Sequence, residues 1–228
     1  MVPGENGSRL SCTRAHAVDL WTQYSLFGAA AAAPEPADLD GLLLAGAQWV
    51  RSGSGARLSV LVADSWRAQA LADAFAVLGM AGPDAVLATP GGYAVRTAFD
   101  ESLVEHAVRW TRGARQGLPD GFQLGAGGLR MWAIAAGHRD DTGYLLATAG
   151  HSMSQPDDPM HRAAGAQLAR LGVAALSLTR RGGHWGPSWR ITSARRLRRL
   201  VELLGPPPDG GADAWPGPLP ASARAADR

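Results

Sequence analysis

The side chains best suited to chemistry in this chain are its arginines. The sequence contains no lysine, so all 22 basic side chains are arginines, and the formal net charge is +2. Because heavy use of alanine, glycine, proline and arginine also follows from a GC-rich genome, the positions of the arginines are more informative than their number. Seven of them crowd one stretch near the carboxyl end: Arg180, Arg181, Arg190, Arg195, Arg196, Arg198 and Arg199. This basic patch predicts contact with nucleic acid.

Side-chain alternation along the expected strands predicts which arginines face outward. In the first half of the chain, Leu58, Val60 and Val62 are expected to point inward, and Arg57 and Ser59 outward. The other strands should follow the same rule: Tyr93, Val95 and Thr97 oppose Arg96; Leu176 and Leu178 oppose Ser177, Thr179 and Arg181; Trp189 and Ile191 oppose Ser188, Arg190 and Thr192. This outward set is small, polar and basic, which suits phosphate contacts. A solvated sheet face would carry the same residue types, and this alternative stays open.

The candidate DNA contacts come from both halves of the chain. Arg195 and Arg199 flank the apolar residues Leu197 and Leu200 of the last expected helix, so a solvated helix face is the competing interpretation there. The full candidate set is Arg57, Arg96, Arg180, Arg181, Arg190, Arg195 and Arg199.

Other kinds of chemistry find little support in the sequence. The six histidines form no dense ligand motif, and the single cysteine, Cys12, excludes an intramolecular disulfide and a cysteine metal cluster. There is no phosphate-binding loop, dinucleotide fingerprint or nucleophile elbow. No apolar run reaches the length of about eighteen residues that a membrane span needs, and the start lacks the order of a signal peptide. No cofactor, metal or membrane association is predicted, and the cysteine content fits a cytoplasmic location.

The elements that position these arginines come as a repeat. Residues 43–46 are echoed by residues 134–137, residues 78–81 by 171–174, and residues 89–93 by 179–183. The echoes keep their order at a spacing of about ninety residues, which is the size of a small domain. Apolar periodicity predicts that each copy folds as helix, hairpin, helix, hairpin, helix.

This pattern predicts an α+β fold and divides the chain into five segments. Two αββαββα repeats are expected at 36–112 and 129–205, joined by a Gly-rich linker at 113–128. Residues 1–35 are expected to be flexible or partly helical, and the Pro/Gly/Ala-rich tail at 206–228 to be disordered, because such a composition buries little apolar surface.

A duplicated unit of this kind, with a small residue and glycine closing its first helix, is similar to the LAGLIDADG family of homing endonucleases. A closer resemblance is to the amino-terminal domain of the WhiA family, which regulates sporulation and cell division genes in bacteria. Three stretches support it: Ala45-Gly46 running into residues 49–53, the loop at 88–92, and residues 117–119 with Gly125-Ala126. The resemblance implies tandem repeats related by a pseudo-two-fold, whose first helices pair and whose two antiparallel sheets form a saddle over DNA.

The chain departs from the family at the ends of the two first helices. In active LAGLIDADG nucleases an acidic residue there holds a divalent metal ion. Ala45 and Ala136 occupy the matching, degenerate metal positions, and a methyl group cannot bind Mg²⁺. Asp140 and Asp141 are expected in a hairpin turn, where aspartate is a usual turn residue. These departures predict that the chain is not an enzyme.

The leading hypothesis is a non-catalytic, DNA-associated regulator of a bacterial cytoplasm, located at the nucleoid, that binds double-stranded DNA through a basic sheet surface. The helix-turn-helix domain of the WhiA family has no counterpart in the sequence before the tail. Two alternatives remain: a protein-interaction module that binds a regulatory protein and no DNA, and a degenerate homing endonuclease. A continuous positive saddle would favour DNA, and an exposed apolar patch a protein partner.

Overall fold

The computed structural model describes residues 26, 28–30, 32–113, 115–148, 158–178 and 186–218. The first repeat contains α1 (Asp40–Leu44), preceded by the 3-10 turn η1 (Pro36–Leu39), then β1 (Gln48–Ser52), β2 (Gly55–Val62), α2 (Ser65–Val77), β3 (Ala81–Thr89), β4 (Gly92–Thr97), the turn η2 (Glu101–Leu103) and α3 (Val104–Arg109). The second contains α4 (Ala126–Ala136), β7 (Gly137–Asp140), β8 (Gly143–Ala147), α5 (Pro159–Arg170), β9 (Leu176–Leu178), β10 (Ser188–Ile191) and α6 (Ala194–Leu204).

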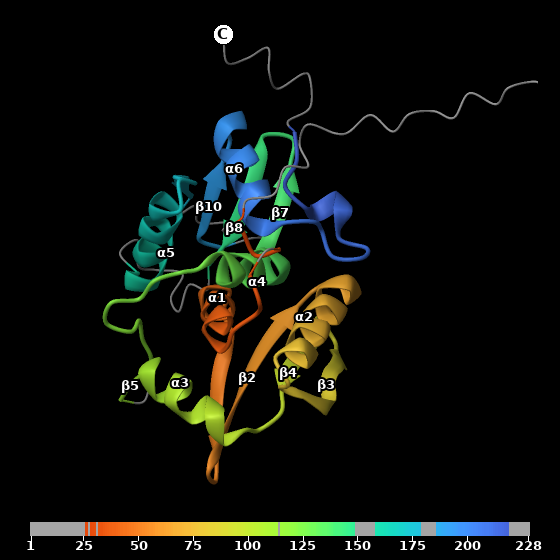
Figure 1. The fold of residues 1–228 in the computed structure, drawn as a ribbon, viewed down its shortest axis with the longest axis vertical. Coiled ribbons are helices and arrows are strands. Elements are labelled where there is room, and N and C mark those ends of the chain that lie inside the picture. The colour runs from red at the N-terminus through yellow and green to blue at the C-terminus, as the bar shows by residue number, and fades with distance from the viewer. Residues whose placement is uncertain are drawn as a thin grey trace, which may run out of the picture.

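The two repeats build sheets of the same topology. The strand orders are β1-β2-β4-β3 and β7-β8-β10-β9, with every pairing antiparallel. Each sheet is a pair of hairpins joined by the helix between them, α2 in the first repeat and α5 in the second (Figure 1). The predicted α+β duplication is therefore confirmed.

The helices that open the repeats pack against each other at the centre of the molecule (Figure 1). Glycine permits this close approach, because a Cβ on Gly41 of α1 would collide with the backbone carbonyl of Gly128 of α4. The expected contact between the two first helices is confirmed. Leu42, Leu43 and Trp132 are buried around it and belong to one apolar core that both repeats share.

The segments outside the repeats are more ordered than their composition predicts. A short hairpin, β5 (Thr111–Arg112) with β6 (Arg115–Gln116), lies where the linker was expected to begin. The described part of the tail, residues 206–218, includes the 3-10 turn η3 (Ala212–Ala214), and Trp215 is 3% exposed. The Trp215 indole N–H donates to the Gly205 carbonyl at 3.0 Å, and the Arg130 guanidinium lies over its ring. The expectation of disorder is wrong for this part of the tail, because one buried aromatic ring anchors it.

No helix among the described residues has the length and apolar character that crossing a bilayer requires.

Candidate nucleic-acid interface

The open face of the first sheet carries two arginines on neighbouring strands. β2 alternates between buried Leu58, Val60 and Val62 and the partly exposed Arg57 and Ser59. The register pairs Ser59 with Arg96 of β4, so Arg57 and Arg96 are diagonal neighbours on the same face. The inward and outward assignments for these two strands are confirmed, including buried Val95 and Thr97 opposite Arg96.

Arg57 and Arg96 have no acidic partner among the residues that the structure describes. Arg57 stacks its guanidinium on Phe99, 4.5 Å from the ring centroid. The Nε atoms of both arginines are closed to solvent and make no hydrogen bond. Two like charges that lie side by side without a counterion repel each other, so this face is electrostatically complementary to an anion.

The same face is less polar than expected. Leu61, between Ser59 and the end of β2, is 72% exposed, and Val50 of β1 is 39% exposed. Both lie on the open side, because Leu61 is paired with Ala94 and Val50 with Arg57. The expectation of a uniformly small, polar and basic surface is wrong here, since two exposed aliphatic side chains flank the charged ones on the same face.

On the second sheet, Arg190 is already paired. Its guanidinium donates to Asp140 at 2.8 Å and to the Thr142 hydroxyl at 2.6 Å, across the β7–β8 turn. Both members of this ion pair are 28% exposed. Arg190 is outward as predicted, but its charge is compensated within the sheet, so an incoming phosphate would have to displace a carboxylate.

The two faces of β9 are exchanged relative to the prediction. Ser177 is paired with Trp189 on the helix-covered side, and Leu176 is paired with Arg190 on the open side, where it is 59% exposed. The expectation that Leu176 and Leu178 point inward is wrong. A one-residue change of register exchanges the two faces of a strand, and in this three-residue edge strand the pairing with β10 decides the register.

The remaining candidate arginines separate into two groups. Arg180 and Arg181 lie outside the described residues. Arg195 and Arg199 lie on α6, whose Leu197 and Leu200 join the same buried cluster as Ile191 of β10. α6 packs against α4 on the covered side of the sheets, so its arginines do not share the open face with Arg57 and Arg96.

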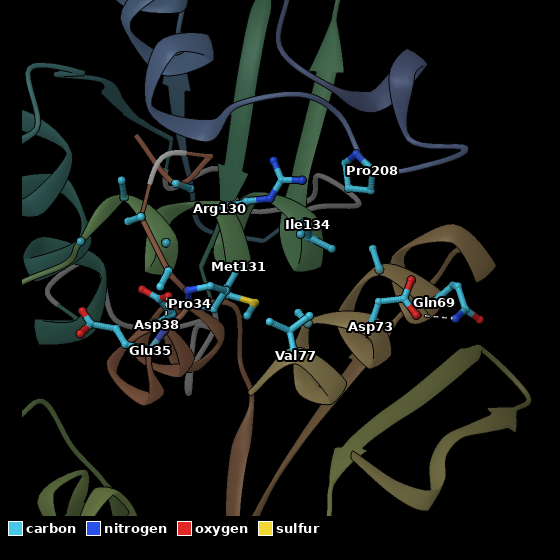
Figure 2. Close-up of a pocket in the computed structure, with 18 of the residues that line it drawn as sticks. Pro34, Glu35, Asp38, Gln69, Asp73, Val77, Arg130, Met131, Ile134 and Pro208 are labelled. Atoms are coloured by element: carbon cyan, nitrogen blue, oxygen red, sulfur yellow. Dashed lines mark hydrogen bonds between the residues drawn. The ribbon is translucent and has the colours of Figure 1, made fainter. Parts of the chain in front are cut away.

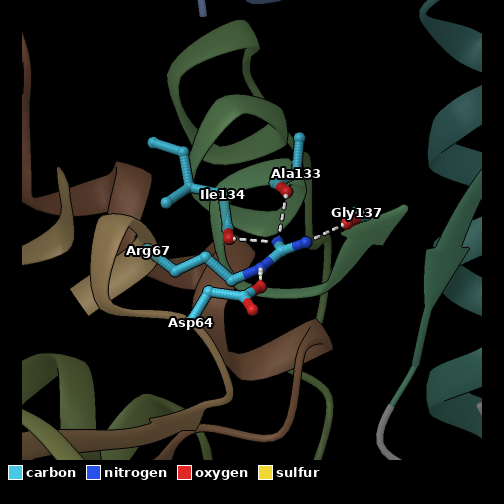
Figure 3. Close-up of polar contacts among 5 residues, drawn as sticks. All are labelled: Asp64, Arg67, Ala133, Ile134 and Gly137. Atoms are coloured by element: carbon cyan, nitrogen blue, oxygen red, sulfur yellow. Dashed lines mark hydrogen bonds and ion pairs between the residues drawn. The ribbon is translucent and has the colours of Figure 1, made fainter. Parts of the chain in front are cut away.

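A side chain of the protein occupies the end of α4. Ala45 is the residue at which α1 ends, and Ala136 is the last residue of α4. At the end of α4 the buried guanidinium of Arg67, from α2, donates to the carbonyl oxygens of Ile134 and Gly137, at 2.6 Å each (Figure 3). Arg67 also pairs with Asp64 at 2.7 Å. A cation thus compensates the negative end of the helix dipole where the family resemblance implies a metal ion.

No group of three or more His, Cys, Asp or Glu side chains among the described residues could hold a metal ion. Asp140 caps its own turn by accepting from the backbone N–H of Thr142, as expected of a turn aspartate. Its hydrogen bonds to Thr142 and its ion pair with Arg190 outweigh its partial burial and lower its pKa below the usual value.

The other end of α4 is closed by a carboxylate, which the sequence analysis missed. Asp38, 8% exposed, accepts from the backbone N–H groups of Glu35 and Gly128. Burial raises the pKa of Asp38, and these two N–H groups partly oppose the rise. A side chain on Gly127 would collide with this carboxylate, so glycine is needed there. The first repeat therefore places an anion at the start of α4 and a cation at its end.

A buried histidine network ties α5 to the second sheet, and it was also missed. The Thr148 hydroxyl donates to the Pro187 carbonyl at 3.1 Å, so it accepts from His161 Nδ1 at 2.8 Å. His161 Nε2 then accepts from the Ser177 hydroxyl at 2.8 Å. Burial lowers the pKa of His161, and Asp158 partly offsets this. One signal was available: His161 and Arg67 both stand three residues after the capping aspartate of equivalent helices.

A cavity of about 480 Å³ lies on the helix side, between α2 and α4 (Figure 2). Its wall is mostly aliphatic, with Val77, Met131 and Ile134 among the lining residues, and Asp73 and Arg130 at its polar edge. It is separate from the open sheet faces and is not part of the candidate interface.

No family model and no curated protein matches the chain. The similar solved structures include a variant of I-DmoI in complex with its nicked target DNA and manganese, and mesophilic variants of the homing endonuclease I-DmoI. Each is 12% identical, with a TM-score of 0.46, and the match covers 74% of this chain and 96% of that one. A complex of I-DmoI with DNA and manganese is 10% identical, with a TM-score of 0.45, and the match covers 75% and 98%.

These neighbours contradict one prediction. I-DmoI is a homing endonuclease and hence an enzyme, so the prediction that this chain is not an enzyme, which rested on Ala45 and Ala136 and on the expectation that Asp140 and Asp141 are turn residues, is withdrawn. At this level of similarity the neighbours carry no argument about the ligand or reaction of this chain. The likeness to the WhiA family stays a prediction.

Proposed function

We propose that this protein binds duplex DNA through the open face of its first sheet. The observation that carries the proposal is the pair Arg57 and Arg96, adjacent on that face and without an acidic partner among the described residues. Guanidinium groups bind phosphate oxygens in a fork geometry, and the Ser59 hydroxyl between the strands can add a hydrogen bond. Arg190 contributes less, because Asp140 already compensates it.

The biological role has two candidates. A degenerate homing endonuclease fits the duplicated fold at least as well as a WhiA-like regulator of sporulation and cell division does. Both roles require duplex binding, and an endonuclease that retains residual activity would in addition nick supercoiled plasmid when Mg²⁺ or Mn²⁺ is supplied. A nicking assay run at a protein concentration that saturates binding separates them.

A second candidate function is protein binding, favoured by the exposed Leu61 and Val50 on the same face. Exposed aliphatic side chains on one sheet face can contribute to a protein interface. In this case the open face would bind a regulatory protein, and Leu61 rather than the arginines would contribute most of the binding free energy.

Fluorescence anisotropy with a labelled duplex of arbitrary sequence tests the proposal. The double substitution Arg57→Gln and Arg96→Gln should weaken binding about tenfold at about 100 mM salt. Arg162→Gln on α5 is the matched control, because it removes the charge of an exposed arginine elsewhere and should leave the affinity within about twofold. Unchanged affinity in the double variant, together with a loss of partner binding in Leu61→Ser, would favour the protein-binding function.

A further inference from the structure

The first turns of α6 carry an unusual concentration of charge. Arg195, Arg196, Arg198 and Arg199 fall within five consecutive residues of this eleven-residue helix. Together with Gly172, Ser193 and Glu202 they line a surface hollow of about 640 Å³, which we call the α6 hollow.

This arrangement works against the stability of the helix. Arg195 and Arg199 are four residues apart and Arg196 and Arg199 three apart, and like charges at these spacings repel each other. Cations in the first turn also oppose the positive end of the helix dipole, and the first turn holds no acidic residue. Arg199 forms an ion pair with Glu202 at 3.3 Å.

Packing does not require these arginines. Leu197, Leu200, Leu203 and Leu204 bury the inner side of α6, while Arg195 and Arg196 are exposed. Arg195 and Arg196 have no ion pair or hydrogen bond to any residue in the described part of the chain. A local feature that lowers stability without contributing to the core is expected where function needs it.

We propose that the α6 hollow is a second anion site, which binds the phosphate groups of a nucleic-acid backbone or of a free polyphosphate. Several guanidinium groups line one concave surface, and arginine binds phosphate in a bidentate manner. The N–H groups at the start of α6 add donors of the right polarity, because Ser193 makes no side-chain cap hydrogen bond to them. The site lies on the helix side of the second sheet, so it is distinct from the Arg57 and Arg96 face.

Titration with sodium tripolyphosphate tests the site, with melting temperature and calorimetry as readouts. At about 100 times the dissociation constant, tripolyphosphate should raise the melting temperature by about 5 to 10 °C, and sodium sulfate at equal ionic strength should give a smaller shift. The variant Arg195→Gln with Arg196→Gln should lose the tripolyphosphate shift. Without ligand and at low salt it should melt at or above the wild-type temperature, because its like-charge repulsion is relieved.

Three results would overturn the proposal: no excess shift over sulfate in the wild type, a variant that keeps the shift, or a stronger response to a polyglutamate peptide than to tripolyphosphate. If a labelled duplex also binds through the hollow, its phosphates are a ligand, whereas a response to tripolyphosphate alone assigns a free polyphosphate. The variant Arg57→Gln with Arg96→Gln should keep the tripolyphosphate shift. Failure of DNA binding by the sheet face is thereby distinguishable from failure of the α6 hollow.

Discussion

Replacing Arg67 by methionine tests whether this side chain of the first repeat stabilises the fold by capping the end of α4 in the second repeat. Methionine keeps much of the aliphatic length of arginine and removes the guanidinium group. Arg67 is 6% exposed, and its guanidinium group donates to the carbonyl oxygens of Ile134 and Gly137 at 2.6 Å each. The substitution leaves two buried acceptors at the end of a helix without a donor.

The expected loss follows from these contacts. A buried acceptor left unsatisfied costs about 1 to 3 kcal/mol, so two of them lower the free energy of unfolding by about 2 to 6 kcal/mol. The ion pair with Asp64 adds little, because the Asp64 side chain is 49% exposed. The variant Arg67→Lys keeps the charge but lacks the fork geometry, and should fall between wild type and Arg67→Met.

Urea unfolding followed by tryptophan fluorescence measures the loss as a lower transition midpoint at unchanged slope. The matched control is Arg162→Met on α5, whose side chain is exposed and should change the free energy of unfolding by less than about 0.5 kcal/mol. If Arg67→Met costs no more than this control, the conclusion that Arg67 stabilises the end of α4 is wrong.

Three further predictions concern packing and pH. Gly41→Ala should destabilise by about 3 kcal/mol because the new methyl group meets the backbone of α4, whereas Gly91→Ala, in open space, should change stability by less than about 0.5 kcal/mol; thermal unfolding measures both. Trp215→Ala should cost about 3 kcal/mol and make residues 206–218 susceptible to protease, and resistance equal to wild type would contradict the docking of the tail. Burial lowers the pKa of His161 below its usual value of 6.5, so the unfolded chain takes up the proton first and stability is lost as the pH falls from 6.5 through the folded-state pKa. His161→Asn should remove this part of the pH dependence, as urea midpoints at about pH 7.5 and about pH 5.5 would show; an identical loss in both proteins would contradict it.

The repeat could be predicted from the sequence because it rests on local signals. Apolar periodicity and glycine-rich turns identify the hairpins and helices of the two repeats. Arg57 lies on the predicted face because β2 alternates between buried and exposed residues, and the pairing of Ser59 with Arg96 places Arg96 on the same face. The faces of β9 were predicted wrongly because the alternation of a three-residue Leu-Ser-Leu run does not by itself determine which side chains face the helices. The pairing of Ser177 with Trp189 determines this.

The remaining errors arise from contacts between distant residues. Arg67 contacts Ile134 of α4 across 67 positions of sequence, and Arg190 contacts Asp140 across 50. No local pattern could therefore show that Arg67 caps a helix or that Asp140 compensates the charge of Arg190. Likewise, the composition of the tail predicts disorder, whereas long-range contacts pack residues 206–218 against the second repeat: the burial of Trp215 and the hydrogen bonds from Arg130 to Pro206 and from Arg139 to Pro218.

The most direct test of the central claim is the salt dependence of duplex binding. Each phosphate that an arginine neutralises contributes about −0.9 to the slope of log affinity against log salt concentration. Removing both Arg57 and Arg96 should therefore make the wild-type slope shallower by about 1.8, while Arg162→Gln leaves it unchanged. A slope that is the same in the double variant and the wild type would contradict the claim that this sheet face binds DNA.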